Sequence, residues 1–155
     1  MAESETMIDA SPECVFEVLL DVGTYPDWVV GCQRIRACDP SWPAPGARFH
    51  HRVGVGPLAV DDSTAIVSLE PPRRLVLEAR AGPVGTAEVV FEVSPEGEGS
   101  RVTITEQPVG GPAAVLRNIV QDGLLQFRNV ETLRRLRECV EKRKAGRSEP
   151  ESSHG

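Results

Sequence analysis

The chain has 155 residues, about one domain in length, and its 40% hydrophobic and 26% charged residues suit one ordinary core. No run approaches the roughly 18 consecutive apolar residues of a membrane span, and the acidic start lacks the layout of a secretory signal. A net charge of −6 argues against a nucleic-acid binder, and the four scattered cysteines fit reduced thiols. We therefore expect a cytoplasmic protein with no nucleic-acid partner and no membrane insertion.

The first elements are a short strand and two short helices. Residues 5–10 alternate between polar and apolar and predict the strand. Ser11 followed by Pro12 is typical of a helix start, because serine caps the first turn and proline fits the first helical position. A second helix is predicted over residues 25–29, with Thr24 as its cap.

Strand-like segments then recur at about ten-residue spacing. Proline and glycine separate them, and such short connections favour an antiparallel meander over parallel crossovers. The predicted strands are residues 47–55, 58–69, 74–80, 86–94 and 101–107.

The period changes after residue 112. Apolar residues recur at steps of three and four from Val115 to Val140, which predicts one long helix of roughly 30 residues that needs a sheet to pack on. The residues from Arg143 to Gly155 are charged or small, and we expect them to form a disordered tail. The predicted domain is therefore residues 1–142.

This order of elements, together with five sequence segments, resembles a known superfamily. The segments are residues 8–21, 25–28, 69–75, 99–106 and 129–136, within a resemblance that spans residues 5 to about 142. They are similar to the START/SRPBCC (birch-pollen-allergen-like) superfamily, and within it to the polyketide cyclase/dehydrase branch. The resemblance implies an α+β helix-grip fold: a curved antiparallel sheet of about six to seven strands wraps around one long C-terminal helix, with two short helices after the first strand.

The resemblance also implies a cavity between the sheet and the long helix, where small molecules bind. Only 5% of the residues are aromatic, so few large rings are available to fill that space. Trp28 has a second interpretation, as an anchor of its short helix on the sheet, and we favour it. The predicted ligand-binding residues are Tyr25, Trp28, Trp42, Phe49, Val89, Phe91, Ile104, Val120, Gly123, Leu124 and Phe127.

Strand alternation selects two candidate catalytic residues. His51 shares a face with Phe49, and Glu106 shares a face with Val102 and Ile104. An imidazole with a pKa near 6.5 suits acid or base catalysis. The alternatives are a His51 bonded to a neighbour at a sheet edge, and a Glu106 that points outward or pairs with an arginine.

Other polar groups carry weaker hypotheses. Adjacent His50 and His51 point to opposite faces, and Cys32 and Cys38 are spaced too widely for a compact zinc site, so we expect no metal and no cofactor. On the long helix, polar residues that border the apolar stripe would orient a ligand, although most are expected on the solvated face. These are Asn118, Gln121, Gln126 and Asn129.

Three functions follow from these observations. The first is a binding module that encloses a hydrophobic small molecule such as a polyketide, a quinone or a lipid. The second is a polyketide aromatase/cyclase-type enzyme in which His51 or Glu106 moves protons. The third is a protein-interaction module, because residues 25–32 also resemble ribosome-associated relatives in the same superfamily. The expected oligomeric state is a monomer or a weak homodimer.

Overall fold

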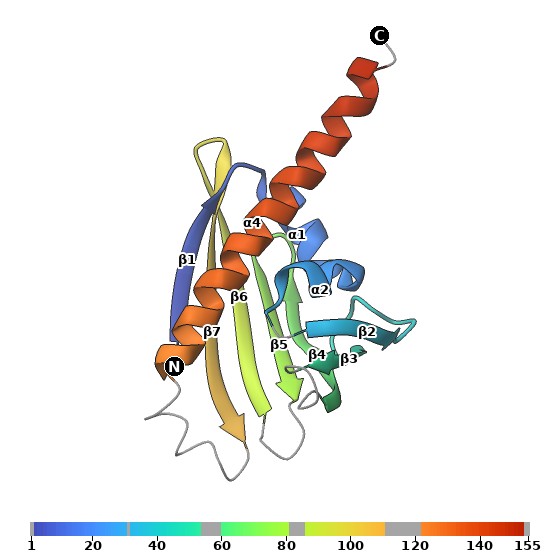
Figure 1. The fold of residues 1–155 in the computed structure, drawn as a ribbon, viewed down its shortest axis with the longest axis vertical. Helices are drawn as coiled ribbons and strands as arrows, with labels where there is room; N and C mark the ends of the chain where they lie inside the picture. Colours follow the sequence, from blue (N-terminus) through green and yellow to red (C-terminus); the bar gives the residue numbers. More distant parts are fainter. Residues whose placement is uncertain (1, 31, 54–59, 81–85, 111–121, 154–155) are drawn as a thin grey trace.

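The computed structural model describes residues 2–30, 32–53, 60–80, 86–110 and 122–153. One antiparallel sheet has the strand order β1-β7-β6-β5-β4-β3-β2, and a long C-terminal helix packs on it, as the predicted fold class requires (Figure 1). The strands are β1 (Ala2–Ile8), β2 (Cys32–Cys38), β3 (Arg48–Val53), β4 (Val60–Glu70), β5 (Arg74–Arg80), β6 (Thr86–Glu96) and β7 (Gly99–Gly110). The helices are α1 (Pro12–Leu20), the 3-10 turn η1 (Val22–Thr24), α2 (Tyr25–Trp28) and α4 (Asp122–Ser153).

The first helix begins where the sequence predicts. The Ser11 hydroxyl accepts a hydrogen bond from the backbone N–H of Cys14 at 3.2 Å, and Pro12 occupies the first helical position. Thr24 precedes α2 as predicted, but its side chain does not cap that helix. The Thr24 hydroxyl instead donates to the carbonyl of Asp21 at 2.7 Å and accepts from the indole of Trp28 at 2.9 Å. Thr24 thus joins η1 to α2.

The structure contains a strand, β2, that the alternation of the sequence does not predict. After Cys32 its residues are exposed, apart from a half-buried Ile35, because β2 is an edge strand with one neighbour. Two register irregularities against β3 disturb its period further. An edge strand that buries so little side-chain surface shows no apolar alternation.

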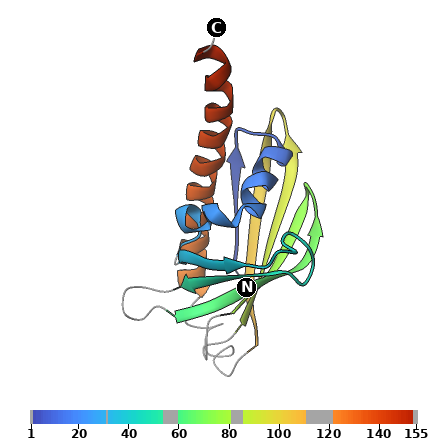
Figure 2. The same ribbon diagram turned by 90° about the vertical axis from the view of Figure 1, so that its right-hand side faces the viewer.

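The sheet curls around the helices. Figure 2 shows β2, β3 and β4 running across the lower part of the molecule, beneath α1 and α2, while α4 stands upright at the left. A register shift between Ile66 and Ser68 interrupts the pairing of β4 with β5, and such bulges increase local bending. Among the described residues α4 packs mainly along β1 and also contacts α1, α2 and β7.

Five of the seven aromatic residues form one cluster between α2 and the concave face of the sheet. Neighbouring rings meet edge to face with centroids 4.7–5.8 Å apart, which is a favourable geometry. We call this part of the interior the closed half of the grip. Its rings are those of Tyr25, Trp28, Trp42, Phe49 and Phe91.

The expected tail is a continuation of α4, which runs to Ser153 and projects beyond the sheet (Figure 1). Arg143 pairs with Asp21 at 2.7 Å, and Lys144 lies 3.6 Å from the carboxylate of Asp9. The first residues after 142 therefore still contact the body of the domain. The end of the domain at residue 142 stays a prediction.

Replacing Gly99 by alanine should destabilise the turn from β6 to β7. A Cβ atom at Gly99 would lie 2.5 Å from the carbonyl oxygen of Ile8, so the backbone of β1 or β7 would have to move. We expect a loss of about 1–3 kcal/mol in the free energy of unfolding, measured by urea denaturation. Gly146→Ala is the control, because a Cβ there meets nothing within 4 Å, and helical alanine should be neutral or stabilising. Equal stability of Gly99→Ala and the wild type would contradict the described contact.

Candidate functional site

The two predicted catalytic residues face the interior, as strand alternation indicates. His51 is 2% exposed and Glu106 is 5% exposed, whereas His50, on the other face of β3, is half-buried. No bulge separates Phe49 from His51 in the pairing of β3 with β4, so the predicted phase is preserved. The side chains of His51 and Glu106 therefore both lie in the interior. Their catalytic role stays a prediction.

The His51 ring has one partner and one unpartnered nitrogen. Its Nε2 lies 2.8 Å from the hydroxyl of Thr64, while Nδ1 has no hydrogen-bond partner of acceptable geometry among the described residues. Burial lowers the pKa of His51 below its ordinary value, and the nearby carboxylate of Asp62 only partly opposes that effect. The imidazole is therefore neutral near pH 7, and its free nitrogen either donates or accepts according to the tautomer.

Glu106 is held by an arginine of α4. Arg128 donates to the Glu106 carboxylate at 3.1 and 3.4 Å, and its Nε donates to the carbonyl of Val30 at 3.1 Å. The alternative in which Glu106 pairs with an arginine is therefore the one observed, and that arginine is Arg128. The ion pair joins β7 to the second turn of α4. The positive charge of Arg128 compensates the negative charge of the buried Glu106 carboxylate.

Small side chains line the concave face beside these polar groups. Ala79 pairs with Thr64 on one side and with Ala87 on the other, so the three share the face of Phe49 and His51. Val89, next on that face of β6, is the cross-strand neighbour of Glu106.

The residues Ala79, Ala87 and Val89 are half-buried, whereas Phe91 and Val93 farther along β6 are buried. We define the open half of the grip as the concave face formed by His51, Thr64, Ala79, Ala87, Val89 and Glu106. It lies at the end of the sheet where β5 ends and β6 and α4 begin (Figure 1).

Three aromatic residues predicted to bind a ligand, Tyr25, Trp28 and Trp42, use their polar atoms in hydrogen bonds within the protein. The Tyr25 hydroxyl donates to the carbonyl of Leu19, and the Trp42 indole donates to that of Leu20 at 2.8 Å. The Trp28 indole bonds to Thr24, and Trp28 is completely buried. Burial also raises the pKa of Tyr25. These contacts favour the anchoring interpretation of Trp28 over ligand contact.

Ile104 and Phe91 are buried in the main core, directly opposite each other on β7 and β6. Gly123, Leu124 and Phe127 lie in the first turns of α4, but their side-chain surroundings lie outside the described residues. Val120, Asn118 and Gln121 lie outside them entirely, and the surroundings of the Gln126 side chain do as well. Their roles in binding stay predictions.

Among the polar residues of α4 whose side chains the structure describes, Asn129 departs from the expected solvated face. It is 1% exposed, and its amide nitrogen Nδ2 has no hydrogen-bond partner among the described residues. Asn129 is in register with Leu133, Leu136 and Val140, which are all buried. Continuing the apolar stripe back from Val140 on a helical wheel would have predicted that Asn129 is buried.

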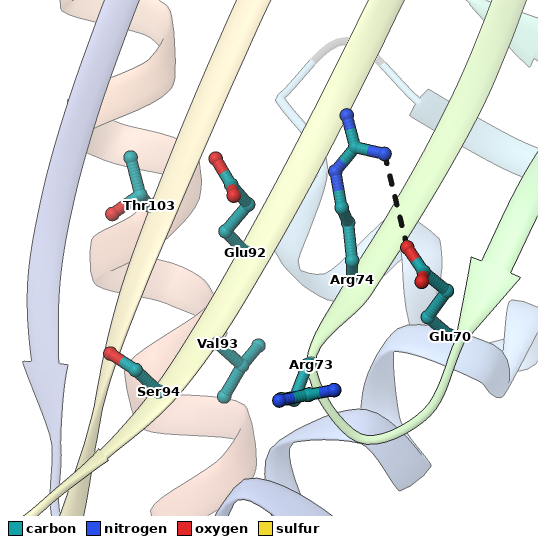
Figure 3. Close-up of a pocket in the computed structure, with 7 residues that line it drawn as sticks. All are labelled: Glu70, Arg73, Arg74, Glu92, Val93, Ser94 and Thr103. Atoms are coloured by element: carbon teal, nitrogen blue, oxygen red, sulfur yellow. Dashed lines mark ion pairs between the residues drawn. The ribbon is translucent and has the colours of Figure 1, made fainter.

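A separate groove of about 460 Å³ lies on the outer face of the sheet. Figure 3 shows side chains from β4 to β7 around it, with Arg74 pointing toward Glu70 at 3.9 Å. Its lining consists of Glu70, Arg73, Arg74, Glu92, Val93, Ser94 and Thr103. Most of these side chains are exposed and charged, and the groove lacks a buried polar group without a partner. We therefore place the candidate site in the open half of the grip.

The cysteines do not assemble a metal site within the described parts of the chain. Cys32 is buried opposite Val53, whereas Cys38 is exposed at the far end of β2. No group of three or more metal-ligating side chains occurs within these described ranges. In the same ranges, no helix has the length and apolarity to cross a bilayer.

A curved sheet gripping a long helix, with buried polar groups at one end, defines a helix-grip protein. The sequence matches the family described as polyketide cyclase / dehydrase and lipid transport over residues 2–141, and the chain belongs to this family. A comparison with curated proteins found no match.

Solved structures share the fold at low sequence identity. A protein from Nitrosomonas europaea is 17% identical, with a TM-score of 0.67 over 91% of this chain and 94% of that one. StfQ, the di-domain ARO/CYC of the steffimycin biosynthetic pathway, is 15% identical with a TM-score of 0.72, over 92% of this chain and 51% of StfQ. DynU16, from the dynemicin biosynthetic locus, is 20% identical with a TM-score of 0.62, over 90% of this chain and 46% of DynU16. These likenesses are of fold.

The stability of the protein should fall as the pH falls through about 6.5. The unfolded chain binds a proton on His51 at its ordinary pKa, whereas the folded state, with a lowered pKa, does so only at lower pH. His51 should add a slope of at most about 1.4 kcal/mol per pH unit in that window. Urea unfolding at pH 7.5 and 5.5 measures it, and His51→Gln should show the smaller loss. An equal loss in both proteins would mean that His51 is not buried in its neutral form.

Removing the charge of Arg128 should leave the Glu106 carboxylate buried without compensation. Because Arg128 is 39% exposed, we expect Arg128→Met to lose only about 1–3 kcal/mol of unfolding free energy at pH 7. The double variant Arg128→Met/Glu106→Gln should recover most of that loss, since an amide needs no counter-charge. Chemical denaturation of both single variants and the double variant completes the cycle. Additive losses would contradict the ion pair.

Proposed function

We propose that this protein binds a hydrophobic small molecule of polyketide, quinone or lipid-like type in the open half of the grip. The observation that carries the proposal is the half-buried surface of Ala79, Ala87 and Val89 beside the buried His51. Small apolar side chains with a few convergent polar groups are the usual lining of a ligand site. The family, whose description includes lipid transport, supports the same class of ligand.

An enzymatic function is the second candidate, and the free Nδ1 of His51 favours it. A neutral imidazole with an unpartnered nitrogen is able to take a proton from a bound substrate or to give one. Glu106 suits proton transfer less well, because Arg128 holds its carboxylate in an ion pair. In an aromatase/cyclase-type reaction, the pocket would fold the chain and His51 would move the proton.

Partners and location follow from the same features. The acidic charge disfavours nucleic acid, and Cys14, Cys32, Cys38 and Cys139 are all free thiols, which is the usual state in the cytoplasm. We place the protein there as a monomer or weak homodimer that contacts a small molecule. A protein-interaction role has less support, because no described feature identifies a protein partner.

Native mass spectrometry of the protein purified from its own host tests the proposal. We expect a mass increment of one small molecule that organic extraction removes. Ala87→Phe should abolish the increment by filling the open half, whereas Ala37→Phe, at an exposed position of β2, should retain it. A bound molecule that survives Ala87→Phe would place the site elsewhere. If neither the wild type nor Ala37→Phe carries a molecule, the binding function is wrong.

A further inference from the structure

We infer that Asn129 is the polar anchor of the bound molecule, and that the molecule carries a neutral carbonyl oxygen at the end that meets α4. This inference rests on the proposed binding function and adds to it the chemistry of the ligand. It starts from two buried nitrogens, Asn129 Nδ2 and His51 Nδ1, which have no partners among the described residues.

The position of Asn129 on α4 directs its side chain to the interior. Steps of four, three and four residues separate Asn129, Leu133, Leu136 and Val140, so the four lie on one face of the helix. All four are at most 1% exposed. A buried amide in line with an apolar stripe destabilises the protein unless both its N–H groups find acceptors.

Two acceptors near this stretch of α4 receive hydrogen bonds from other donors, and neither bonds to Asn129 Nδ2. The Glu106 carboxylate accepts two hydrogen bonds from Arg128, the residue that precedes Asn129 on α4. One turn farther along, the Thr132 hydroxyl accepts from the backbone N–H of Val30 at 3.3 Å. Since an amide nitrogen only donates, the missing partner of Asn129 is an acceptor, and an oxygen of a bound molecule would provide it.

The charges around the site select a neutral carbonyl over a carboxylate. Arg128, the cation that the described residues bring to this turn of α4, is already paired with Glu106. A buried ligand carboxylate would meet Glu106 without a cation of its own, which is unfavourable. On the sheet side, the neutral His51 is able to bond a second oxygen, as a donor to a carbonyl or as an acceptor from a hydroxyl. The ligand is therefore an oxygenated apolar molecule.

The test uses two probes of equal shape, 9-fluorenone and fluorene, which differ by one carbonyl oxygen. We expect the wild-type protein to bind fluorenone about five- to tenfold more tightly, as one buried hydrogen bond would give. Asn129→Leu should remove that preference while still binding fluorene. Without any ligand, the same variant should melt a few degrees higher than the wild type, because it no longer buries an unpaired amide.

Thr132→Val is the matched control, since Thr132 is also buried on α4 but already has a partner. It should melt lower than the wild type and keep the preference for fluorenone. Asn129→Asp separates donation from acceptance, because a carboxylate accepts hydrogen bonds but does not donate them. This variant should therefore lose its binding of fluorenone.

The outcomes separate the inference from the function. Equal affinity of the wild type for both probes, unchanged in Asn129→Leu, overturns the role of Asn129 and leaves the binding function standing. A lower melting temperature of Asn129→Leu with equal weakening of both probes assigns the residue a structural role and also overturns the inference. If the wild type binds neither probe and carries no molecule from its host, the inference and the proposed function both fail.

Discussion

Edge-to-face packing of Tyr25 against Trp28 and Phe49 holds the short helix α2 on the concave face of the sheet. A chain with so few aromatic residues places most of them in this one cluster, and the remaining concave surface therefore carries small side chains. Along β6 the change is direct, from the buried Phe91 to the half-buried Val89 and Ala87. The closed half is thus a packed core, whereas the open half is lined by small, half-buried side chains beside the buried His51, Thr64 and Glu106.

The buried polar groups follow the same division. In the closed half, Tyr25 and Trp42 donate to backbone carbonyls, so the polar atoms of these rings contribute to folding. The Glu106–Arg128 pair is internally compensated, whereas His51 on β3 and Asn129 on α4 each retain a nitrogen without a partner among the described residues. A packed core rarely tolerates such groups. Under the proposed function these two nitrogens are left for a ligand, whereas the polar atoms of the closed half serve the fold.

The fold class, the interior direction of His51 and Glu106, and the start of α1 were all predictable from the sequence, because each depends on local periodicity or on capping. Strand β2 was not, since its neighbours supply its stability and its side chains remain exposed. The partnership of Arg128 with Glu106 was also beyond local reasoning, because it depends on how α4 sits against β7. Asn129 was visible as a polar residue, but its burial follows from the same docking of the helix.

The apolar stripe of α4 shows why a ligand and the stability of this protein should be coupled. If the helix only covered the sheet, a leucine at position 129 would continue the pattern of Leu133 and Leu136 and would remove an unpaired donor. The amide instead makes the empty protein less stable than its packing allows. A ligand oxygen that accepts from Asn129 restores the missing hydrogen bond only in the bound state. Binding then stabilises the fold through that contact in addition to the apolar surface it buries, and a plain hydrocarbon of the same shape does not.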